Sequence, residues 1–434
     1  MISPGLNSSP KALHIVLNGV MEDSRVLKCA WSLGNAGWEV LVIGSSPHSH
    51  RDTFTIGYAK IDRLSVKVVV KQEAAAKVLR ALRYYKRRFE AEFLPLKKPA
   101  VPNLRKGLSE ILPVALNFAP DVVHAHDYTA LPIAGSIVES LRKAGVKAAL
   151  VYDAHEYVPG VGHLQKPLRD MYTAEERKYS SAAKAILSVS EGMSDLLIPH
   201  LGIKNRPDIV ANDPLVEGQM ASKRNLRNDC GIGADVALMV YSGAVAPQRG
   251  IATAVEALRK LPSLHLALIA NPANKTVQNL VAGAEDVSER FHVLPYVPNA
   301  ELVSYLSSAD IGLIPIHHRL NHEISLITKF GEYMQARLPI VVSDVKTMSE
   351  EVIRLGNGEV FTAENTEEFV SAVSKVLDNP KKYRDAYTPE RLAERSWERQ
   401  AEHLVEIYNR ISNKVPQARE HMRFEITEPE KIQH

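Results

Sequence analysis

The chain has 434 residues, 45% hydrophobic and 24% charged, which is typical of a folded protein large enough for two or three domains. A net charge of +3 excludes a uniformly basic surface, and two distant cysteines, Cys29 and Cys230, exclude a disulfide framework and a thiolate metal site. No run approaches the roughly 18–20 apolar residues that span a bilayer, and the N-terminus lacks a signal-peptide pattern, so we expect a cytoplasmic protein.

The first half of the chain alternates short apolar runs with helical patterns. The apolar runs predict strands at 12–18, 39–44, 65–70, 121–125, 148–153, 185–189 and 208–211. Helical patterns lie between them, at 24–36, 73–92, 102–117, 129–144, 165–182 and 191–200. Continuous apolar strands separated by helices indicate a parallel sheet that helices cover on both faces.

The alternation restarts after a polar connection at 211–235. It predicts further strands at 236–242, 264–270, 291–294, 310–314, 339–343 and 359–361. We therefore predict an α/β fold with two doubly wound Rossmann-like domains that face each other across a cleft, where ligands bind beyond the carboxyl ends of the strands. We predict a first domain at 1–212 and a second domain at 213–390. A long final helix follows at 391–412, and a loose polar tail at 413–434.

Several well-known motifs are absent from the sequence. It contains no GxGxxG and no GxxxxGK[ST], which disfavours a dehydrogenase-type dinucleotide site and a P-loop NTPase. It also lacks HExxH and any pair of aspartates separated by one residue, so we expect neither a metal nor a cofactor. Protein cations should then stabilise the charge that develops in a reaction.

The segment 321–344 carries the strongest functional signal. Ser325 and Thr328 precede an amphipathic helical run, and a helix start rich in hydroxyls suits an anion such as phosphate. Lys329 adds a positive charge there, while Glu332 lies one turn further and can accept hydroxyl groups. Phosphate at one end and hydroxyls at the other indicate a nucleotide-sugar. The alternative is an ordinary capped helix with a surface Lys–Glu pair.

A second signal lies at 241–251, YSGAVAPQRGI, between a predicted strand and a predicted helix. Gly243 permits close approach of the backbone to a ligand, and Arg249 lies where a phosphate would bind. The alternative is a strand-to-helix turn with a solvated arginine. Two further residues complete the candidates for donor binding, Glu323 and Tyr296.

Two histidines follow predicted strands of the first domain. His155 lies just past the strand at 148–153, and a mobile polar loop follows it, so it is the better catalytic candidate. His126 and Asp127 follow the strand at 121–125, and we expect His126 to hold the loop through its neighbours. A lone histidine is more often structural than catalytic, but two at equivalent strand ends favour a functional interpretation.

The first strand-to-helix turn offers Gly19 and Arg25 to a donor or an acceptor, unless Arg25 merely pairs with Asp23. Further along, the helical pattern at 73–92 is basic and amphipathic, which suits an anionic membrane surface or an acidic acceptor. A helix packed on the core with a solvated basic side explains the same pattern equally well. Nucleic acid is a less favoured partner, because the edges of the predicted sheets show no interleaved stacking aromatics.

Taken together, these segments resemble the GT-B glycosyltransferases, and within them the large retaining family four, also called group 1. The resemblance covers residues 11–412 and is carried by DSRVLKCAWSLGNAGWEV, YDAHEY, SGAVAPQRGI and SLITKFGEYMQARLPIVVSD. It implies that His155 belongs to the donor site and that Arg249 binds the donor diphosphate. It further implies that Glu332 binds the ribose, as the second glutamate of a Glu-x7-Glu pair, while Thr328 and Lys329 hold phosphate.

The chain departs from the family pattern at three positions. Ile324 stands where the first glutamate of the pair belongs, with Glu323 one place early. Ala244 stands where the family often has an arginine, and Arg337 where a glycine usually ends the helix. The resemblance therefore implies the fold and the class of donor, and leaves the sugar open.

The function that the resemblance implies is transfer of a sugar, with retention and without metal, from a nucleotide-diphosphate-sugar to a hydroxyl acceptor. The first domain would receive the acceptor, which is a glycan, a lipid-linked sugar or a small molecule. The second domain would bind the nucleotide-sugar, and the final helix would cross back to the first domain. Two alternatives are a nucleotide-sugar epimerase of the same fold and a catalytically silent nucleotide-sugar-binding protein.

Overall fold

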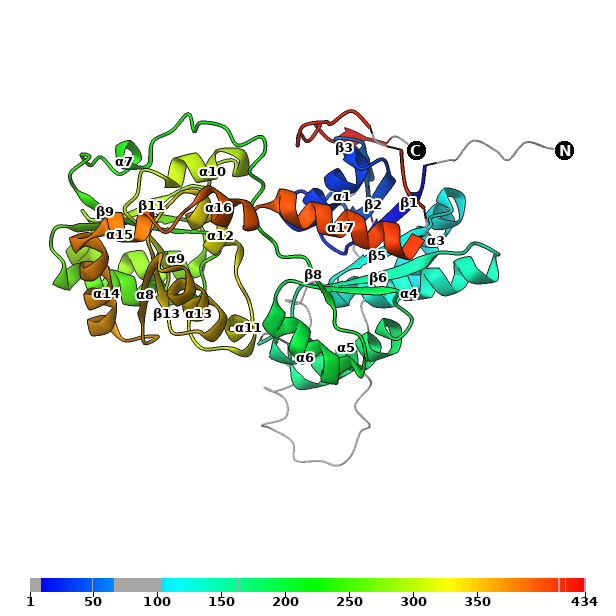
Figure 1. Ribbon diagram of the computed structural model, residues 1–434, viewed down its shortest axis with the longest axis horizontal. Coiled ribbons are helices and arrows are strands. Elements are labelled where there is room, and N and C mark those ends of the chain that lie inside the picture. Colours follow the sequence, from blue (N-terminus) through cyan, green and yellow to red (C-terminus); the bar gives the residue numbers. More distant parts are fainter. Residues whose placement is uncertain are drawn as a thin grey trace, which may run out of the picture. The chain divides into compact units, whose positions relative to one another are not determined.

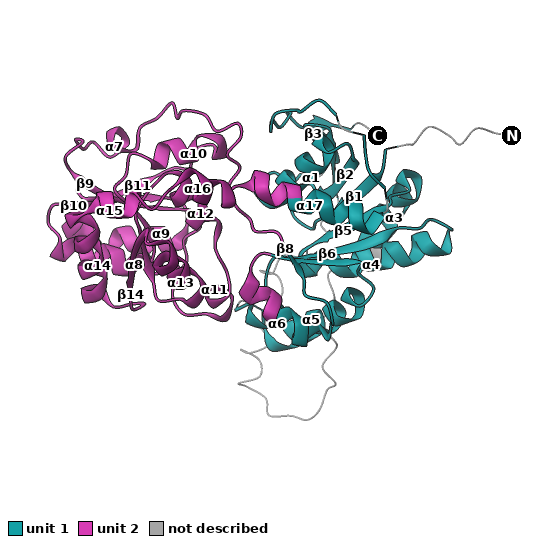
Figure 2. Ribbon diagram, in the orientation of Figure 1, with its two compact units in different colours: residues 1–188, 196–208, 403–434 teal, residues 189–195, 209–402 magenta. Residues whose placement is uncertain are grey.

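The structure, a computed structural model, describes residues 9–48, 50–65, 104–162, 164–412, 414–417 and 419–432. The chain divides into two compact units, drawn in teal and magenta in Figure 2. Unit 1 consists of residues 1–188, 196–208 and 403–434, and unit 2 of residues 189–195 and 209–402. Each unit contains one sheet flanked by helices (Figure 1), which confirms the predicted α/β class with two Rossmann-like domains.

The sheet of unit 1 has the strand order β15-β3-β4-β2-β1-β5-β6-β7-β8. The run from β4 to β7 pairs in parallel, and its members are β4 (Ala59–Leu64), β2 (Glu39–Ser45), β1 (Lys11–Ile15), β5 (Val122–His126), β6 (Ala149–Ala154) and β7 (Ala185–Ser188). The remaining strands are β3 (Asp52–Ile56), β15 (Glu430–Lys431) and β8 (Asp208–Ile209). The parallel strands are buried along nearly their whole length, because helices cover both faces of the sheet.

Helices follow most of the parallel strands of unit 1. They are α1 (Ser24–Asn35), α3 (Leu104–Phe118), α4 (Asp127–Lys143), α5 (Lys166–Ser180) and α6 (Glu191–Leu201), with a short 3-10 turn η1 (Val158–Gly160). The α1 start is as the sequence predicts, since the Asp23 carboxylate accepts a hydrogen bond of 3.2 Å from the Val26 amide. Gly37 follows the helix with φ 96°, the left-handed conformation that glycine favours.

The sequence did not reveal the hairpin of β3 and β4, which extends the sheet at its edge. Both strands are short, and no strand was predicted between residues 44 and 65. Of the predicted strand at 65–70, all but its first residue lies outside the described residues, as does the whole basic helix at 73–92. Among the helices that the structure does describe, none is long and apolar enough to cross a membrane.

The C-terminal region differs from the prediction in two ways. The single helix expected at 391–412 is two helices, α16 (Pro389–Glu394) and α17 (Trp397–Ser412), because the amide of Trp397 donates to the Pro214 carbonyl at the break. The tail expected to be loose is instead bound to unit 1. Strand β15 pairs antiparallel with β3, and the Trp31 indole donates a 2.9 Å hydrogen bond to the Met422 carbonyl.

Unit 2 contains a fully parallel sheet with the order β11-β10-β9-β12-β13-β14. Its strands are β9 (Ala237–Ser242), β10 (Leu264–Ile269), β11 (Phe291–Leu294), β12 (Ile311–Ile314), β13 (Ile340–Ser343) and β14 (Gly358–Phe361). All six predicted strands of this half are therefore confirmed within two residues. The order changes direction at β9, so ligands are expected beyond the carboxyl ends of β9 and β12.

The helices of unit 2 pack on both faces of this sheet, around two buried apolar clusters. They are α7 (Leu226–Asp229), α8 (Ile251–Lys260), α9 (Lys275–Ala282), α10 (Asn299–Leu306), α11 (Leu320–Glu323), α12 (Thr328–Gln335), α13 (Lys346–Leu355), α14 (Thr366–Asp378) and α15 (Pro380–Arg384). The 3-10 turns are η2 (Pro247–Arg249) and η3 (Glu285–Val287).

Candidate active site

Helix α12 positions the first group of candidate residues. Phe330, Tyr333 and Met334 lie on one helical face and are fully buried in the core of unit 2, which fixes the rotation of the helix. The N-cap residue, Ile327, makes no side-chain cap hydrogen bond. The first turn of α12 thus keeps the positive end of its dipole without a capping side chain, a favourable place for an anion.

Lys329 lies in that first turn and is only 8% exposed. Burial, followed by the positive charge of Arg249, lowers its pKa to about 7, against the smaller raising effect of Glu332. Its Nζ lies 3.3 Å from the Tyr241 hydroxyl and 4.5 Å from the centre of that ring. The alternative of a solvated surface pair is therefore wrong for Lys329.

Two glycines allow close packing of the backbone, one beside Lys329 and one next to Arg249 in the chain. Gly243 follows β9 with φ 118°, and a Cβ on it would lie 3.5 Å from the Lys329 Nζ. Gly250 has φ 69°, and a Cβ there would lie 1.7 Å from the Pro315 carbonyl oxygen, so only glycine fits. The turn that carries Arg249 therefore packs against the segment that follows β12. A hydrogen bond of 3.0 Å from the His317 amide to the Gln248 carbonyl joins the two.

The other candidates in unit 2 have different surroundings. Thr328 opens α12, and its hydroxyl accepts a 3.2 Å hydrogen bond from the Asn212 amide group. Glu332 and Ser325 are half-buried, whereas Tyr296 is 52% exposed beyond β11. Glu323 already accepts hydrogen bonds from His318, at 2.6 Å, and from the Lys346 amide, at 2.8 Å. Its carboxylate is thus engaged within the protein.

Unit 1 gathers its polar side chains around Asp153, near the carboxyl end of β6. Arg25 donates to both carboxylate oxygens, from Nε at 2.9 Å and from Nη2 at 2.7 Å. Burial alone would raise the pKa of Asp153, but Arg25 and His155 outweigh it and hold that pKa well below its usual range. Asp153 is therefore a buried carboxylate anion.

His155 is the partly exposed member of this group. Its Nε2 lies 3.1 Å from Asp153 Oδ2, and its side chain is 21% exposed. Burial opposes the charged form, yet the charge and hydrogen bond of Asp153 prevail and raise the pKa of His155. This arrangement favours the protonated imidazole.

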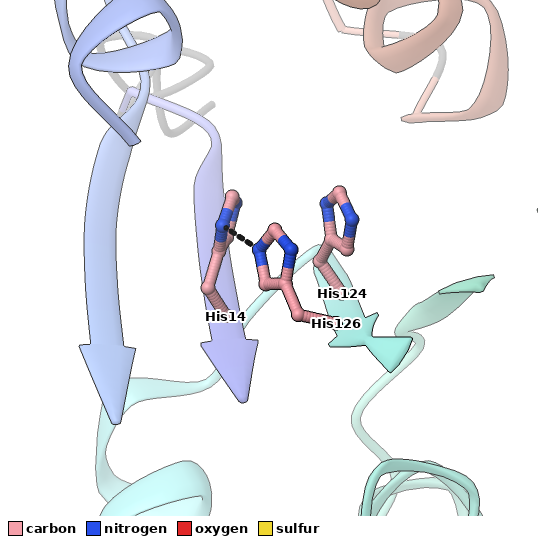
Figure 3. Close-up of side chains that lie close together, drawn as sticks. All are labelled: His14, His124 and His126. Atoms are coloured by element: carbon pink, nitrogen blue, oxygen red, sulfur yellow. Dashed lines mark hydrogen bonds between the residues drawn. The ribbon is translucent and has the colours of Figure 1, made fainter. Parts of the chain in front are cut away.

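Three fully buried histidines lie near the same carboxylate, and Figure 3 shows their three rings close together. His14 comes from β1, while His124 and His126 come from β5 and stack with ring centres 4.1 Å apart. His14 Nδ1 lies 2.9 Å from His126 Nε2. Burial lowers the pKa of each ring, that of His126 to about 3. Neutral imidazoles are metal ligands, and the nitrogens of these three are close enough together to hold an ion.

The remaining candidates of unit 1, which we expected on the acceptor side, are Gly19, Arg25, His126 and Asp127, and their surroundings differ. A direct contact of Arg25 with an acceptor needs correction, because this side chain is buried and binds Asp153, 128 positions along the chain. His126 is also fully buried and contacts other side chains. Gly19 accepts a 3.2 Å hydrogen bond from Arg63 through its carbonyl. Asp127 has φ 70°, and burial raises its pKa to about 7.

Asp153, His14 and His124 were not among the residues predicted from the sequence. Each lies within a strand of mostly apolar residues, which was interpreted only as part of the core. A charged or polar residue within a buried strand nevertheless indicates a functional role or a buried partner. The pattern that reveals them is a set of polar residues at the same level of β1, β5 and β6. Recognising that pattern needs the strand order, which a single sequence does not supply.

Two family models match the chain, and together they span most of it. The glycosyl transferase 4-like domain matches residues 24–213, and the glycosyl transferases group 1 model matches residues 222–392. This chain belongs to the group 1 glycosyltransferases of the GT-B fold. It is accordingly a nucleotide-sugar-dependent glycosyltransferase, as the resemblance implied.

Relatives and solved structures agree with the family. The alpha-maltose-1-phosphate synthase of Mycolicibacterium smegmatis is 26% identical over 334 residues, which cover 68% of this chain and 80% of that protein. Sucrose-phosphate synthase from Thermosynechococcus elongatus is similar in structure, with a TM-score of 0.70, 16% identity and coverage of 93% and 99%. Anabaena HepE, solved with UDP and glucose, has a TM-score of 0.64, 14% identity and coverage of 92% and 100%.

Proposed function

We propose that this glycosyltransferase moves a sugar from a nucleoside-diphosphate-sugar to a hydroxyl acceptor, with retention of configuration and without a metal ion. The observation that carries the proposal is the position of Lys329. Its ammonium group is buried beside the charge of Arg249, at the uncapped start of α12. Two neighbouring positive charges are unfavourable without an anion, and a diphosphate supplies one.

Sugar transfer from such a donor mainly requires stabilisation of the negative charge on the departing diphosphate. Arg249, Lys329 and the amides at the start of α12 would supply this charge, and Thr328 would add a hydroxyl. Glu332, one turn into the helix, would accept hydrogen bonds from the ribose hydroxyls. Gly243 would let the diphosphate approach the backbone. Retention would follow from attack on the face that the leaving group vacates.

Unit 1 would serve the reacting sugar and the acceptor through His155, Asp127 and Gly19. The acceptor class is supported by two relatives, which are named as synthases of sugar phosphates. A sugar phosphate is therefore included with glycans and lipid-linked sugars among the acceptors that we propose. The basic segment at 73–92 would add attraction to an anionic acceptor or an anionic membrane surface.

The proposal that the reaction needs no metal ion is supported by the side chains that contact Asp153. Arg25 occupies both of its oxygens, so a divalent cation at that carboxylate would face a full positive charge at contact distance. The nearby His14 and His126 nitrogens bind each other. Excess chelator should therefore leave the initial rate of the purified enzyme within about twofold of its starting value. Loss of activity on chelation, restored by one added metal, would contradict this part of the proposal.

The test of the whole proposal is donor consumption with an acceptor panel. Nucleoside-diphosphate-glucose and related donors are incubated with sugar phosphates, oligosaccharides and lipid-linked sugars, and products are identified by mass spectrometry and proton NMR. A new glycosidic bond with the anomeric configuration of the donor supports the proposal. An isomerised donor without acceptor would indicate an epimerase. Binding without any donor consumption would indicate a silent protein, an alternative that Ile324 at the place of the first glutamate favours.

A further inference from the structure

The buried pair of Arg25 and Asp153 links two elements that are distant in sequence. Arg25 lies in the first turn of α1, which follows β1, whereas Asp153 lies on β6, two strands away across β5. The two side chains are 3% and 0% exposed and meet through two parallel hydrogen bonds. A bidentate contact of this kind fixes the direction of the carboxylate as well as its charge.

Asp153 in turn determines which nitrogen of His155 carries hydrogen. As an anion it can only accept, so the His155 Nε2 at 3.1 Å must be the donor. In the neutral ring this leaves Nδ1 with a lone pair, and no protein group binds Nδ1 among the residues that the structure describes. The partly exposed ring is thus held through Nε2, one of its two nitrogens.

The surroundings of His155 limit it to this orientation. His126 meets the ring edge-on, with centres 5.7 Å apart, and the Nδ1 of His126 lies 3.4 Å from the same Asp153 oxygen. His124 Nε2 lies 3.5 Å from that oxygen. The charges that act on His155 are those of Asp153, Arg25 and Asp127. Of these, only Asp153 contacts the ring through a hydrogen bond.

We propose that Arg25 and Asp153 are positioning residues of the transfer reaction, which hold His155 with its Nε2–H inward and its Nδ1 directed at the ligand. This inference rests on the proposed function, since it assigns to the pair a role in the same site. Asp153 acts directly on His155, and Arg25 acts one step further away by fixing Asp153. Neither residue touches the substrates.

The kinetic test compares Asp153→Asn, His155→Ala and the double variant in the full-length enzyme. If Asp153 acts through His155, Asp153→Asn lowers kcat roughly 10- to 100-fold, with KM for the donor within about threefold. The same substitution has no further effect when His155 is already alanine. Arg25→Lys, which keeps the charge but loses the bidentate contact, should lower kcat less and in the same direction.

The matched control is Glu176→Gln, which neutralises another buried carboxylate of unit 1. Glu176 lies 2.7 Å from the ring nitrogen of His200 and accepts a hydrogen bond of 2.5 Å from the Tyr152 hydroxyl, so its hydrogen bonds go to residues other than Asp153 and His155. This variant should retain the wild-type kcat while losing thermal stability. If Asp153→Asn and Glu176→Gln behave alike, or if the effects of Asp153→Asn and His155→Ala multiply, the pair is structural and the inference is overturned.

A spectroscopic measurement separates this inference from the proposed function. Long-range proton–nitrogen NMR of the ligand-free enzyme, at a pH where the ring is neutral, should show hydrogen on Nε2 of His155, and Asp153→Asn should lose this preference for one nitrogen. This result without transferase activity would retain the positioning and reject the proposed function. Hydrogen on Nδ1 of neutral His155 in the wild type would reject the positioning, whatever the enzyme transfers. If Asp153→Asn fails to fold, Arg25→Lys carries both readouts.

Discussion

The two units treat buried positive charge in opposite ways. In unit 1 the Arg25 guanidinium meets the carboxylate of Asp153 through two hydrogen bonds, so its charge is neutralised within the protein. In unit 2 Lys329 forms no ion pair among the residues that the structure describes, and Arg249 adds a second positive charge nearby. A cation paired within the protein contributes to a rigid frame, whereas a buried cation without an ion pair is available to an anionic ligand.

The largest effect should follow from removing the ligand-binding charges of unit 2. Arg249→Ala and Glu332→Ala should each lower kcat/KM about 100-fold or more, because one lost stabilising group typically costs ~3 kcal/mol in the transition state. Steady-state kinetics of the purified variants measures this. Arg259→Ala is the control, since this exposed arginine pairs with Glu256 and Asp286 on the surface. Activity of Arg249→Ala within threefold of the control would refute the assignment.

The second-largest effect should be a pH dependence of nucleotide binding that comes from Lys329 of unit 2. Only protonated Lys329 attracts a diphosphate, and with a pKa of about 7 it loses its proton as the pH rises. The affinity for a nucleoside diphosphate should therefore weaken about tenfold between pH 6.5 and 8.5. Calorimetric titration across this range gives the slope, and Lys329→Arg should flatten it, because arginine stays charged. An equal slope in both proteins would place the titrating group elsewhere.

The fold was predictable from the sequence because of its parallel strands. Most of these are short continuous apolar runs, such as β9 or β13, and that pattern is visible without any partner. The hairpin of β3 and β4 escaped because its antiparallel strands lack a continuous run, and the pairing of β15 depends on contacts across nearly the whole chain. Non-local pairing of this kind leaves little trace in local sequence.

Residues of the candidate site could be predicted where the residues that form it are close together in the sequence. Lys329 and Glu332 lie in one helix, and Gly243 and Arg249 lie in one strand-to-helix connection, so the members of each pair are close in sequence and the sequence pointed to them. Asp153 was missed because its partner, Arg25, is 128 positions away and the strand between them contributes the histidines. The role of Glu323 could not be judged either, because its contact with the Lys346 amide depends on the fold.

A smaller effect concerns the basic segment of unit 1. If residues 73–92 attract an anionic surface, sedimentation with vesicles that contain about one-third anionic lipid should retain the protein at low salt and release it at high salt. Neutral vesicles provide the control, and a variant with Lys77, Arg80, Arg87 and Arg88 changed to glutamine should stay in the supernatant. Absence of binding to anionic vesicles at low salt would refute the proposal that this segment binds an anionic membrane surface.

The central claim, that the cations of unit 2 are a site for diphosphate, is tested most directly by thermal stability with matched ligands. A ligand bound only by the folded protein raises Tm in proportion to the logarithm of its concentration. Nucleoside diphosphates should raise Tm at concentrations where the nucleosides have no effect, and the double variant Arg249→Ala, Lys329→Ala should lose that increase. Equal shifts from a nucleoside and its diphosphate, or an undiminished shift in the double variant, would contradict the claim.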